Sequence, residues 1–327
     1  MSLPNNKEIG GYFGFSLPNL EQFPYIQSVK YNSARSAFFD LLSQNNIKKI
    51  WMPKFICDTM IEPLLILNIN VQYYNIDESF YPIIPNRLKE NEYLFYVNYF
   101  GLCTSVQQEL LSKYPNEKII FDHSQAFFVT PFECFATLYS PRKILPIAEG
   151  GLLVTKAITT PNYINRDKEE MIQQYHHCFT SLLSNTSDGY EGFKRNEMLF
   201  TDCRPKKISQ ITEELINCFD YESIKTTRLE NFKLLHSQFG IINKLHVDID
   251  KIESPLTYPL LLDTNISSYL IKNKIFTPTY WLDSLKRVAV DSFEYGFIFN
   301  TTHLVCDQRY SQKEMELQIS KIKEHIQ

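Results

Sequence analysis

Two short stretches place side chains where they could carry out chemistry. The stretch LYSPRKILPIAEGGLLVT, residues 138–155, sets Lys143 between an apolar run and a Gly-Gly pair. The stretch FDHSQAF sets Asp122 at the end of another apolar run, with Gln125 three residues later. A lysine amine is a nucleophile toward carbonyl compounds. Taken singly, each residue has an ordinary explanation, because a lysine after a strand is usually solvated and an acid there often caps a turn.

Two further stretches carry polar groups at predicted element boundaries. NSARSAFF sets Asn32, Ser33 and Ser36 at the start of a predicted helix, where free N–H groups and the helix dipole favour an anion. On this stretch alone, a plain helix cap is the commoner explanation. VNYFG closes another run with Asn98 and Gly101, which also fits a simple turn.

The elements that must position these residues follow from the pattern of the first half of the chain. Short β-branched and aromatic runs alternate there with helical periodicity, which predicts an α/β fold with a mostly parallel sheet. Ligands bind such sheets outside the carboxyl ends of the strands, where the four stretches lie. Strands are expected over 48–54, 70–77, 93–100, 118–124, 135–140 and 151–156, and helices over 33–45, 57–68 and 104–114.

The second half of the chain predicts a smaller α/β domain. The polar segment 184–198 contains two glycines and is expected to be a mobile loop. We expect residues 1–205 to form a large domain with an N-terminal arm, 206–239 to form bridging helices, and 240–327 to form the small C-terminal domain. The elements expected here are helices over 166–185, 209–218, 221–239, 267–274 and 311–326, and a strand over 257–263.

The bulk properties exclude several classes of protein. With 327 residues, 44% hydrophobic content and a net charge of −4, the chain is expected to be globular and to bind small molecules rather than nucleic acid. It has no apolar stretch of about 20 residues, and MSLPNNKEIGG lacks a hydrophobic leader, so we expect a cytoplasmic protein without a membrane segment. Seven cysteines without a CxxC pair indicate reduced thiols, and His176-His177 lacks metal-ligand spacing, so no metal is expected.

The joint order of the four stretches resembles the DegT/DnrJ/EryC1/StrS family of sugar aminotransferases, which depend on pyridoxal phosphate (PLP). In that family a DAAQA-type segment precedes a lysine that is followed, a few residues later, by EGG or DGG. Here DHSQA precedes Lys143, and EGG begins at Glu149. The likeness extends to GGYFGFSLP, MPKFICDTM, NYFG and HLVCDQRYSQKEM, and so covers nearly the whole chain. It implies the fold of aspartate aminotransferase, the PLP-dependent transferase fold type I.

The resemblance implies a role for each site residue. Lys143 would form a Schiff base with PLP and shuttle a proton, and Asp122 would pair with the pyridine nitrogen. Gln125 would hydrogen-bond the 3′-oxygen of the cofactor, and the Gly-Gly pair would allow close backbone approach. The other implied cofactor-binding residues are Ser33, Ala34, Arg35 and Ser36 around the phosphate, and Cys57, Asn98, Ser124 and Ser140 elsewhere at the site.

Several positions depart from the family pattern. Leu138 stands where members usually carry a phosphate-binding serine, so Ser140 or Thr137 substitutes or the contact is missing. Cys57 stands where many members stack an aromatic residue. Lys207 lies nearest to the position from which the family often supplies an asparagine to the partner subunit's phosphate. Tyr280 or Trp281 could line a sugar pocket.

The function that the resemblance implies is amino-group transfer, with glutamate as donor, to a keto-sugar that is expected to be nucleotide-linked. It also implies a homodimer with shared active sites. A PLP-dependent sugar dehydratase is a weaker alternative, because those members replace the lysine by histidine. A non-catalytic binding or regulatory relative stays open as a second alternative, because Leu138 removes a phosphate contact.

Overall fold

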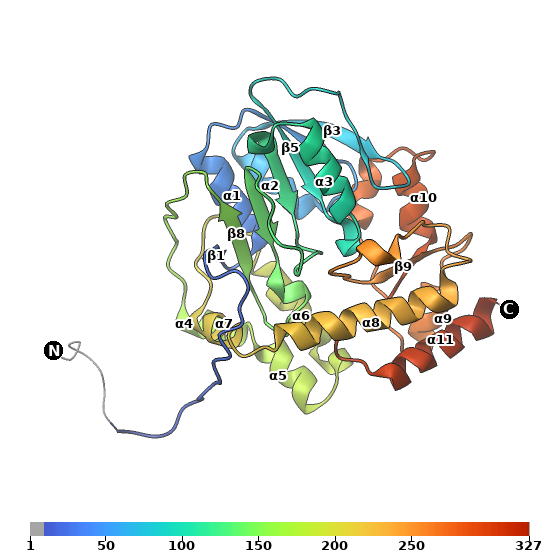
Figure 1. The fold of residues 1–327 in the computed structure, drawn as a ribbon. Coiled ribbons are helices and arrows are strands. Elements are labelled where there is room, and N and C mark those ends of the chain that lie inside the picture. The colour runs from blue at the N-terminus through green and yellow to red at the C-terminus, as the bar shows by residue number, and fades with distance from the viewer. Residues whose placement is uncertain (1–9, 327) are drawn as a thin grey trace.

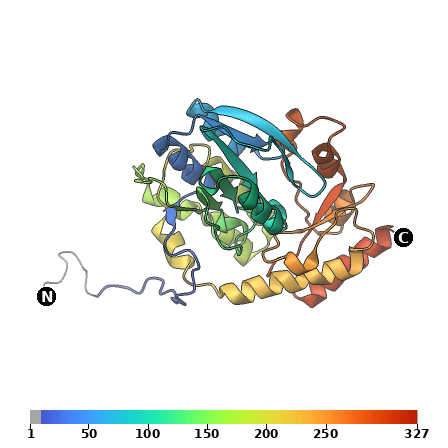
Figure 2. The ribbon, with the colours of Figure 1, turned by 45° about the horizontal axis from the view of Figure 1, so that its top comes forward.

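A computed structural model of the chain describes residues 10–326 (Figure 1). Residues 1–9, which make up most of the polar start discussed above, and residue 327 lie outside the described part. Within it, residues 10–22 are exposed and extend away from the body (Figures 1 and 2). Their backbone contacts the remainder through Leu20, whose N–H donates to the carbonyl of Asn217 at 2.8 Å.

One eight-stranded sheet forms the centre of the molecule, in the order β1-β8-β7-β6-β5-β2-β3-β4. The neighbours β7-β6, β6-β5, β5-β2 and β2-β3 are parallel, whereas β1-β8, β8-β7 and β3-β4 are antiparallel. The mostly parallel α/β fold is therefore confirmed, and all six strands predicted in the first half are present. The strands are β1 Val29–Tyr31, β2 Lys49–Pro53, β3 Asn70–Ile76, β4 Pro82–Ile83, β5 Glu92–Val97, β6 Ile119–Asp122, β7 Ala136–Tyr139 and β8 Gly151–Thr155.

Helices connect these strands and cover the sheet. Helix α1, Ala34–Gln44, begins at the Ser33 cap and packs on β7 and β8 through a buried apolar face. The predicted helix over 57–68 is divided into a 3₁₀ turn and α2, Glu62–Ile66. Helix α3, Thr104–Lys113, follows β5. The 3₁₀ turns are η1 Asp58–Met60, η2 Tyr99–Gly101, η3 Asn116–Lys118, η4 Pro141–Lys143, η5 Ile249–Lys251 and η6 Leu282–Lys286.

The prediction of a mobile loop over 184–198 is wrong, because most of this segment forms helix α6, Thr186–Met198. The Asn185 side chain caps this helix by accepting a hydrogen bond from the Asp188 N–H at 3.0 Å. Its two glycines face α5, His176–Leu183, and a Cβ on Gly189 would lie 2.9 Å from the His177 carbonyl oxygen. The glycines therefore permit close helix packing. The predicted helix over 166–185 is also interrupted, since α4, Lys168–Gln173, ends before α5 begins.

The remaining elements form the C-terminal part of the chain. Helix α8, Tyr221–Phe239, runs from beside α7, Gln210–Leu215, to the C-terminal elements, where it contacts α11, Gln312–Ile326 (Figure 2). A second sheet pairs β9, Tyr258–Leu261, antiparallel with β10, Thr301–Leu304. Helices α9, Ser267–Lys272, and α10, Phe293–Asn300, complete this part. The sequence predicted α7, α8, β9, α9 and α11 but missed β1, β4, β10 and α10.

Across residues 10–326, no helix is both long enough and apolar enough to cross a membrane. All seven cysteines are free; Cys103, Cys203 and Cys306 are buried, and the other four are partly exposed.

Candidate active site

Asp122 and Lys143 lie at the same edge of the large sheet. Asp122 is the last residue of β6, and Lys143 ends the 3₁₀ turn η4 that directly follows β7. Strands β6 and β7 are parallel neighbours in which Asp122 pairs with Leu138. The carboxyl ends of these strands therefore bring the acid and the lysine together, as the sequence predicted.

Cys57 lies near both residues, in the segment that follows β2. Burial raises the pKa of the Cys57 thiol, the nearby charge of Lys143 lowers it, and the charges of Asp122 and Asp283 raise it again. The thiol is thus held in its neutral form. Asp283 belongs to η6 of the C-terminal part, and its carboxylate accepts a hydrogen bond from the Asp58 N–H at 2.5 Å. The site is therefore bordered by both parts of the chain.

The turn after Asp122 fixes the carboxylate. Asp122 is only 4% exposed, and its Oδ1 atom accepts a hydrogen bond from the Ser124 N–H at 2.8 Å. The Asn98 N–H donates to the Asp122 carbonyl at 3.0 Å, which joins the ends of β5 and β6. Ser124 is buried beside this carboxylate and offers only a small side chain.

Gln125 is fully buried and uses only half of its amide within the protein. Its Oε1 atom accepts a hydrogen bond from the Phe100 N–H at 2.8 Å, whereas its Nε2 atom has no partner among the described residues. An unpaired buried donor is costly, so such a group is expected to meet an acceptor when a ligand is bound. Phe100 adopts a left-handed conformation with φ of 56°, which turns its N–H toward Gln125.

The start of α1 offers backbone N–H groups, while its serine hydroxyls are already engaged. Ser33 Oγ accepts a hydrogen bond from the Ser36 N–H at 3.1 Å, and Ser36 Oγ donates to the Arg204 carbonyl at 3.3 Å. Ser33 thus acts as an ordinary helix cap, whereas the Ser36 hydroxyl is bound to the backbone of another segment. The N–H groups of Ala34 and Arg35 belong to the first turn, where a helix supplies no acceptor. The Arg35 guanidinium pairs with Glu62 at 2.8 Å.

The Gly-Gly pair lies against this helix start. Gly150 adopts φ of 134°, and its N–H donates to the Asn32 carbonyl at 2.7 Å. A Cβ on Gly151 would lie 2.0 Å from the Ser33 carbonyl carbon and 2.3 Å from the Ala34 nitrogen. Only glycine permits this approach, which agrees with the predicted role of the pair.

The turn that carries Lys143 is attached to α6. Lys143 is exposed, and its backbone N–H donates to the carbonyl of the buried Ser140 at 3.1 Å. Arg142 forms a two-bond ion pair with Glu197, and Asn196 Nδ2 donates to the Ala148 carbonyl at 2.7 Å. Asn196 and Glu197 are not among the predicted site residues, because the composition of their segment is typical of a loop.

Glu149, the acid that precedes the glycines, has a structural role. It is fully buried and lies 2.7 Å from a guanidinium nitrogen of Arg166. Its Oε1 atom also accepts hydrogen bonds from the Ser209 N–H at 2.7 Å and from Thr212 Oγ1 at 3.2 Å. Glu149 therefore connects β8 to the start of α7.

Three other predicted positions have distinct surroundings. The Asn98 amide is fully engaged, since Nδ2 donates to Gln107 at 2.7 Å and to Thr104, and Oδ1 accepts from the Cys103 N–H. Leu138 is completely buried in β7. Lys207 is largely exposed and lies 3.7 Å from Glu213.

Aromatic residues of the C-terminal part lie against the turn that contains Phe100. The ring centroid of Tyr280 lies 5.3 Å from that of Phe100, and the centroid of Trp281 lies 6.4 Å from it. Both side chains are partly buried. Both rings therefore lie close to the backbone that positions Gln125.

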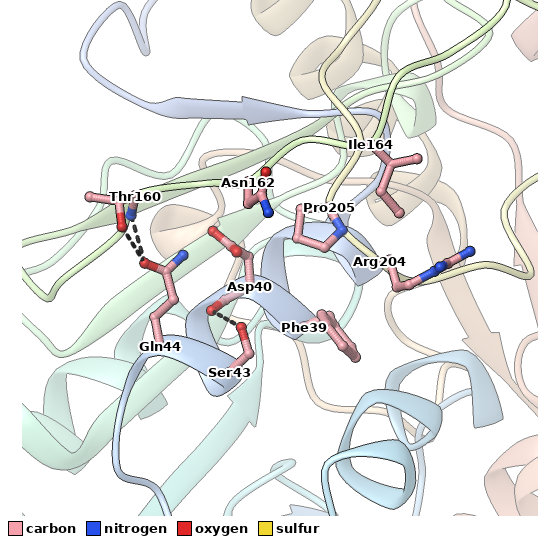
Figure 3. A pocket seen from close by; sticks show the side chains of 9 residues that line it. All are labelled: Phe39, Asp40, Ser43, Gln44, Thr160, Asn162, Ile164, Arg204 and Pro205. Carbon is pink, nitrogen blue, oxygen red and sulfur yellow. Dashed lines mark hydrogen bonds between the residues drawn. The ribbon is translucent and has the colours of Figure 1, made fainter.

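A separate groove lies alongside α1 (Figure 3). Asp40 and Gln44 of α1 form one side, and Gln44 Oε1 accepts a hydrogen bond from the Thr160 N–H at 2.7 Å. Arg204 and Pro205 form the other side. Asp122, Gln125 and Lys143 do not line this groove, so the predicted chemistry does not take place there.

Comparisons with known proteins identify the fold. Searches against protein-family models and against curated proteins found no match. Solved structures do match. One is a DegT DnrJ EryC1 StrS aminotransferase from Brucella abortus, and another is PseC from Helicobacter pylori, an aminotransferase involved in the biosynthesis of pseudoaminic acid. A third is Spr1654 from Streptococcus pneumoniae, which is named as a sugar aminotransferase and was solved in its PLP form.

The three likenesses extend over most of each chain. The sequence identities to the Brucella protein, PseC and Spr1654 are 12%, 15% and 17%. The corresponding TM-scores are 0.62, 0.61 and 0.59. Each alignment covers 91% of this chain and 85%, 86% and 86% of the respective neighbour. The chain therefore has the fold of these aminotransferases, which confirms the predicted fold type.

Proposed function

We propose that this chain is a PLP-dependent aminotransferase that transfers an amino group from glutamate to a nucleotide-linked keto-sugar. The observation that carries the proposal is the convergence of Asp122, the unpaired Nε2 of Gln125 and Lys143 at one sheet edge. The shared fold with proteins named as sugar aminotransferases supports the same activity.

The residues present fit pyridoxal phosphate. A buried carboxylate suits its pyridine nitrogen, an unpaired amide donor suits its 3′-oxygen, and a helix start suits its phosphate. These groups are Asp122, Gln125 and the N–H groups of Ala34 and Arg35. When bound, this cofactor withdraws electron density from the substrate carbon next to the transferred nitrogen.

The side chains of this protein supply the remaining chemistry. Lys143 would hold the cofactor through Nζ and, once the substrate amine has displaced it, the free amine would carry a proton from the substrate carbon to the cofactor. Asp122 would keep a proton on the pyridine nitrogen, and the turn whose Ser124 N–H binds its Oδ1 atom holds the carboxylate in place. The free Nε2 donor of Gln125 would bind the 3′-oxygen. Cys57 and Ser124 are small side chains, and neither would obstruct a ring at the site.

The proposal includes a homodimer in the cytoplasm. Lys143 is exposed in a single chain, whereas covalent chemistry of this kind is favoured in a site from which water is excluded. A second chain can provide that cover. The arm over residues 10–22 carries Tyr12, Phe13 and Phe15, each more than 90% exposed, and apolar side chains of this size favour burial against a partner.

A non-catalytic relative with the same fold remains the alternative from a different class. The observation in its favour is Leu138, which is buried where a phosphate-binding serine would stand. The retained Asp122, Gln125 and Lys143 argue against it, and Lys143 also argues against a sugar dehydratase.

Covalent labelling tests the proposal. Protein purified with PLP is expected to absorb in the visible or near-ultraviolet range, and reduction with borohydride should attach the cofactor to Lys143, as shown by peptide mapping. Lys143→Ala should bind PLP without attachment and should not form 2-oxoglutarate from glutamate with any keto-sugar nucleotide. Lys54→Ala serves as the control and should label normally. Attachment to Lys54 or Lys207, or to no lysine, would refute the assignment.

A further inference from the structure

The C-terminal part contacts the lysine turn through Gln308. The Nε2 atom of Gln308 donates to the carbonyl of Ile144 at 2.7 Å, and Ile144 directly follows Lys143. The Ile144 N–H in turn donates to the Pro141 carbonyl at 2.9 Å. Gln308 therefore fixes one end of the short turn from which the Lys143 side chain projects.

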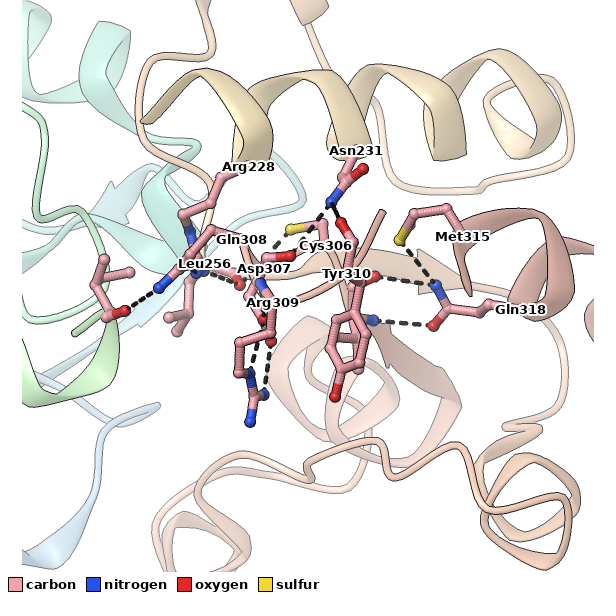
Figure 4. A network of polar contacts seen from close by, with 12 residues as sticks. Arg228, Asn231, Leu256, Cys306, Asp307, Gln308, Arg309, Tyr310, Met315 and Gln318 are labelled. Carbon is pink, nitrogen blue, oxygen red and sulfur yellow. Dashed lines mark hydrogen bonds and ion pairs between the residues drawn. The ribbon is translucent and has the colours of Figure 1, made fainter. Parts of the chain in front are cut away.

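Gln308 is positioned by a buried arginine on α8. Arg228 is 2% exposed, and its Nη1 donates to Gln308 Oε1 at 2.7 Å (Figure 4). Arg228 also donates to two backbone carbonyls, from Nη2 to Leu256 at 2.7 Å and from Nε to Pro255 at 3.0 Å. A planar guanidinium donates in fixed directions, so these bonds set the relative positions of α8, Gln308 and residues 255–256.

The same arginine is connected to Gln125 by a second path. The Leu256 N–H donates to the Phe100 carbonyl at 2.8 Å, and the Phe100 N–H donates to Gln125 Oε1 at 2.8 Å. The unpaired Nε2 of Gln125 is the other end of that amide. One buried side chain thus lies at the start of two hydrogen-bonded paths, which end at Gln125 and at the residue after Lys143.

We propose that Arg228 and Gln308 are positioning residues that set the Lys143 turn and the Gln125 amide relative to one another. Displacement of a reacting group by about 1 Å is enough to lose much of its catalytic effect, so this connection bears on the chemistry although neither residue is among the groups assigned to the cofactor. The consequence for cofactor chemistry rests on the proposed function, whereas the effect on the turn does not.

Two substitutions at Gln308 separate its two bonds. Gln308→Glu keeps an acceptor for Arg228 but places an oxygen opposite the Ile144 carbonyl, which removes the bond to the turn and adds repulsion. Gln308→Met removes both bonds at similar length. The matched control is Arg309→Gln, because Arg309 is the next residue, is exposed, and pairs only with Asp307 in the hydrogen bonds and ion pairs of residues 10–326.

Hydrogen exchange in the full chain without PLP gives a readout that is independent of activity. The amides of Lys143, Ile144 and Leu145 donate to carbonyls within the turn. We expect them to exchange about tenfold faster in Gln308→Glu and Gln308→Met than in Arg309→Gln, because one hydrogen bond that stabilises the closed turn is lost. Equal rates in all three variants would overturn the proposal. Arg228→Lys, which cannot donate in the same three directions, should show the same faster exchange. If this variant fails to fold, the Gln308 variants still decide the question.

A second readout concerns the loaded protein. In both Gln308 variants, the pH at which the visible absorption band of bound PLP changes should shift, and kcat should fall more than KM changes, whereas Arg309→Gln should match the parent protein. Faster exchange at the turn together with an unmoved band would show that Gln308 stabilises the turn without positioning Lys143, and would also overturn the proposal. Absence of PLP binding in the parent protein would refute the proposed function but leave the exchange result decisive for the turn.

Discussion

At the scale of single residues, the predicted site positions differ in how much of their hydrogen-bonding capacity the protein itself uses. The amide of Asn98 is fully engaged at the start of α3. The Ser33 hydroxyl caps α1, and the Ser36 hydroxyl donates to the Arg204 carbonyl. Gln125 keeps a buried donor without a partner. The structure thus favours Gln125 and backbone N–H groups, rather than the serine hydroxyls, as the groups that contact a ligand.

Asp122→Asn tests the residue that we propose to pair with the cofactor ring nitrogen. The amide oxygen can still accept the Ser124 N–H, so the fold and covalent attachment should persist. Turnover should fall by orders of magnitude, because a neutral amide cannot keep a proton on the ring nitrogen. The measurement is the rate of amino transfer from glutamate at saturating PLP.

Asp40→Asn is the matched control for this measurement. Asp40 is also buried, but its carboxylate accepts a hydrogen bond from the Tyr31 hydroxyl at 2.7 Å, on a part of α1 that faces the separate groove. Its turnover should stay close to that of the parent protein. Near-normal turnover in Asp122→Asn would remove Asp122 from the site.

At the scale of elements, the contact between β8 and the start of α1 depends on Gly151. In Gly151→Ala the new Cβ would overlap the backbone of Ser33 and Ala34, which must move apart. We expect a loss of about 3 kcal/mol in the free energy of unfolding, as overpacking of this kind costs. Weaker PLP binding should accompany it, because the same N–H groups are displaced.

Gly296→Ala provides the control, since a Cβ there meets no atom within 4 Å and the residue lies inside α10. It should raise the free energy of unfolding by about 0.5–1 kcal/mol. Denaturant titrations of both variants check the difference. A Gly151→Ala protein as stable as the parent would contradict the close approach of β8 and α1.

The elements also show what the sequence can and cannot predict. The strands β2, β3, β5, β6, β7 and β8 are predictable because their apolar runs match strand periodicity. Helix α6 was missed because Gly189 and Gly192 are typical of loops, whereas here they allow contact with α5. Strand β1 has only three residues. Asp122 and Lys143 each follow a predicted strand, so their place at the carboxyl edge of the sheet can be predicted from local patterns. The Arg228 network joins residues far apart in the sequence, and no local pattern indicates it.

At the scale of the whole molecule, two buried histidines make stability depend on pH. Burial lowers the pKa of His123 to about 3 and that of His303 to about 3, from about 6.5 in the unfolded chain. Between these values the unfolded chain binds more protons than the folded one. Stability is therefore lost as the pH falls from about 6.5 toward 3.

From this difference we expect each histidine to remove about 2 kcal/mol from the free energy of unfolding between pH 7 and pH 5. His303 packs against Phe100 and Tyr280, with centroid distances of 4.6 and 4.7 Å, so His303→Phe should fit and should weaken the pH dependence by that amount. His325 is exposed and stacks on Tyr269 with a ring-centroid distance of 4.3 Å. The control His325→Phe should leave the pH dependence of stability unchanged. Urea titrations at both pH values measure the effect, and identical slopes for His303→Phe and the parent protein would contradict it.

The antiparallel pairing of β7 and β8 has a consequence for the order of folding. These strands are consecutive in the sequence, and Tyr139 pairs with Leu152 across the loop that contains Lys143. Closing such a short loop costs less chain entropy than forming the parallel crossovers that align β2, β5 and β6. We therefore expect the lysine loop to form early during folding, and the surroundings of Asp122 to be completed only when the longer crossovers have closed.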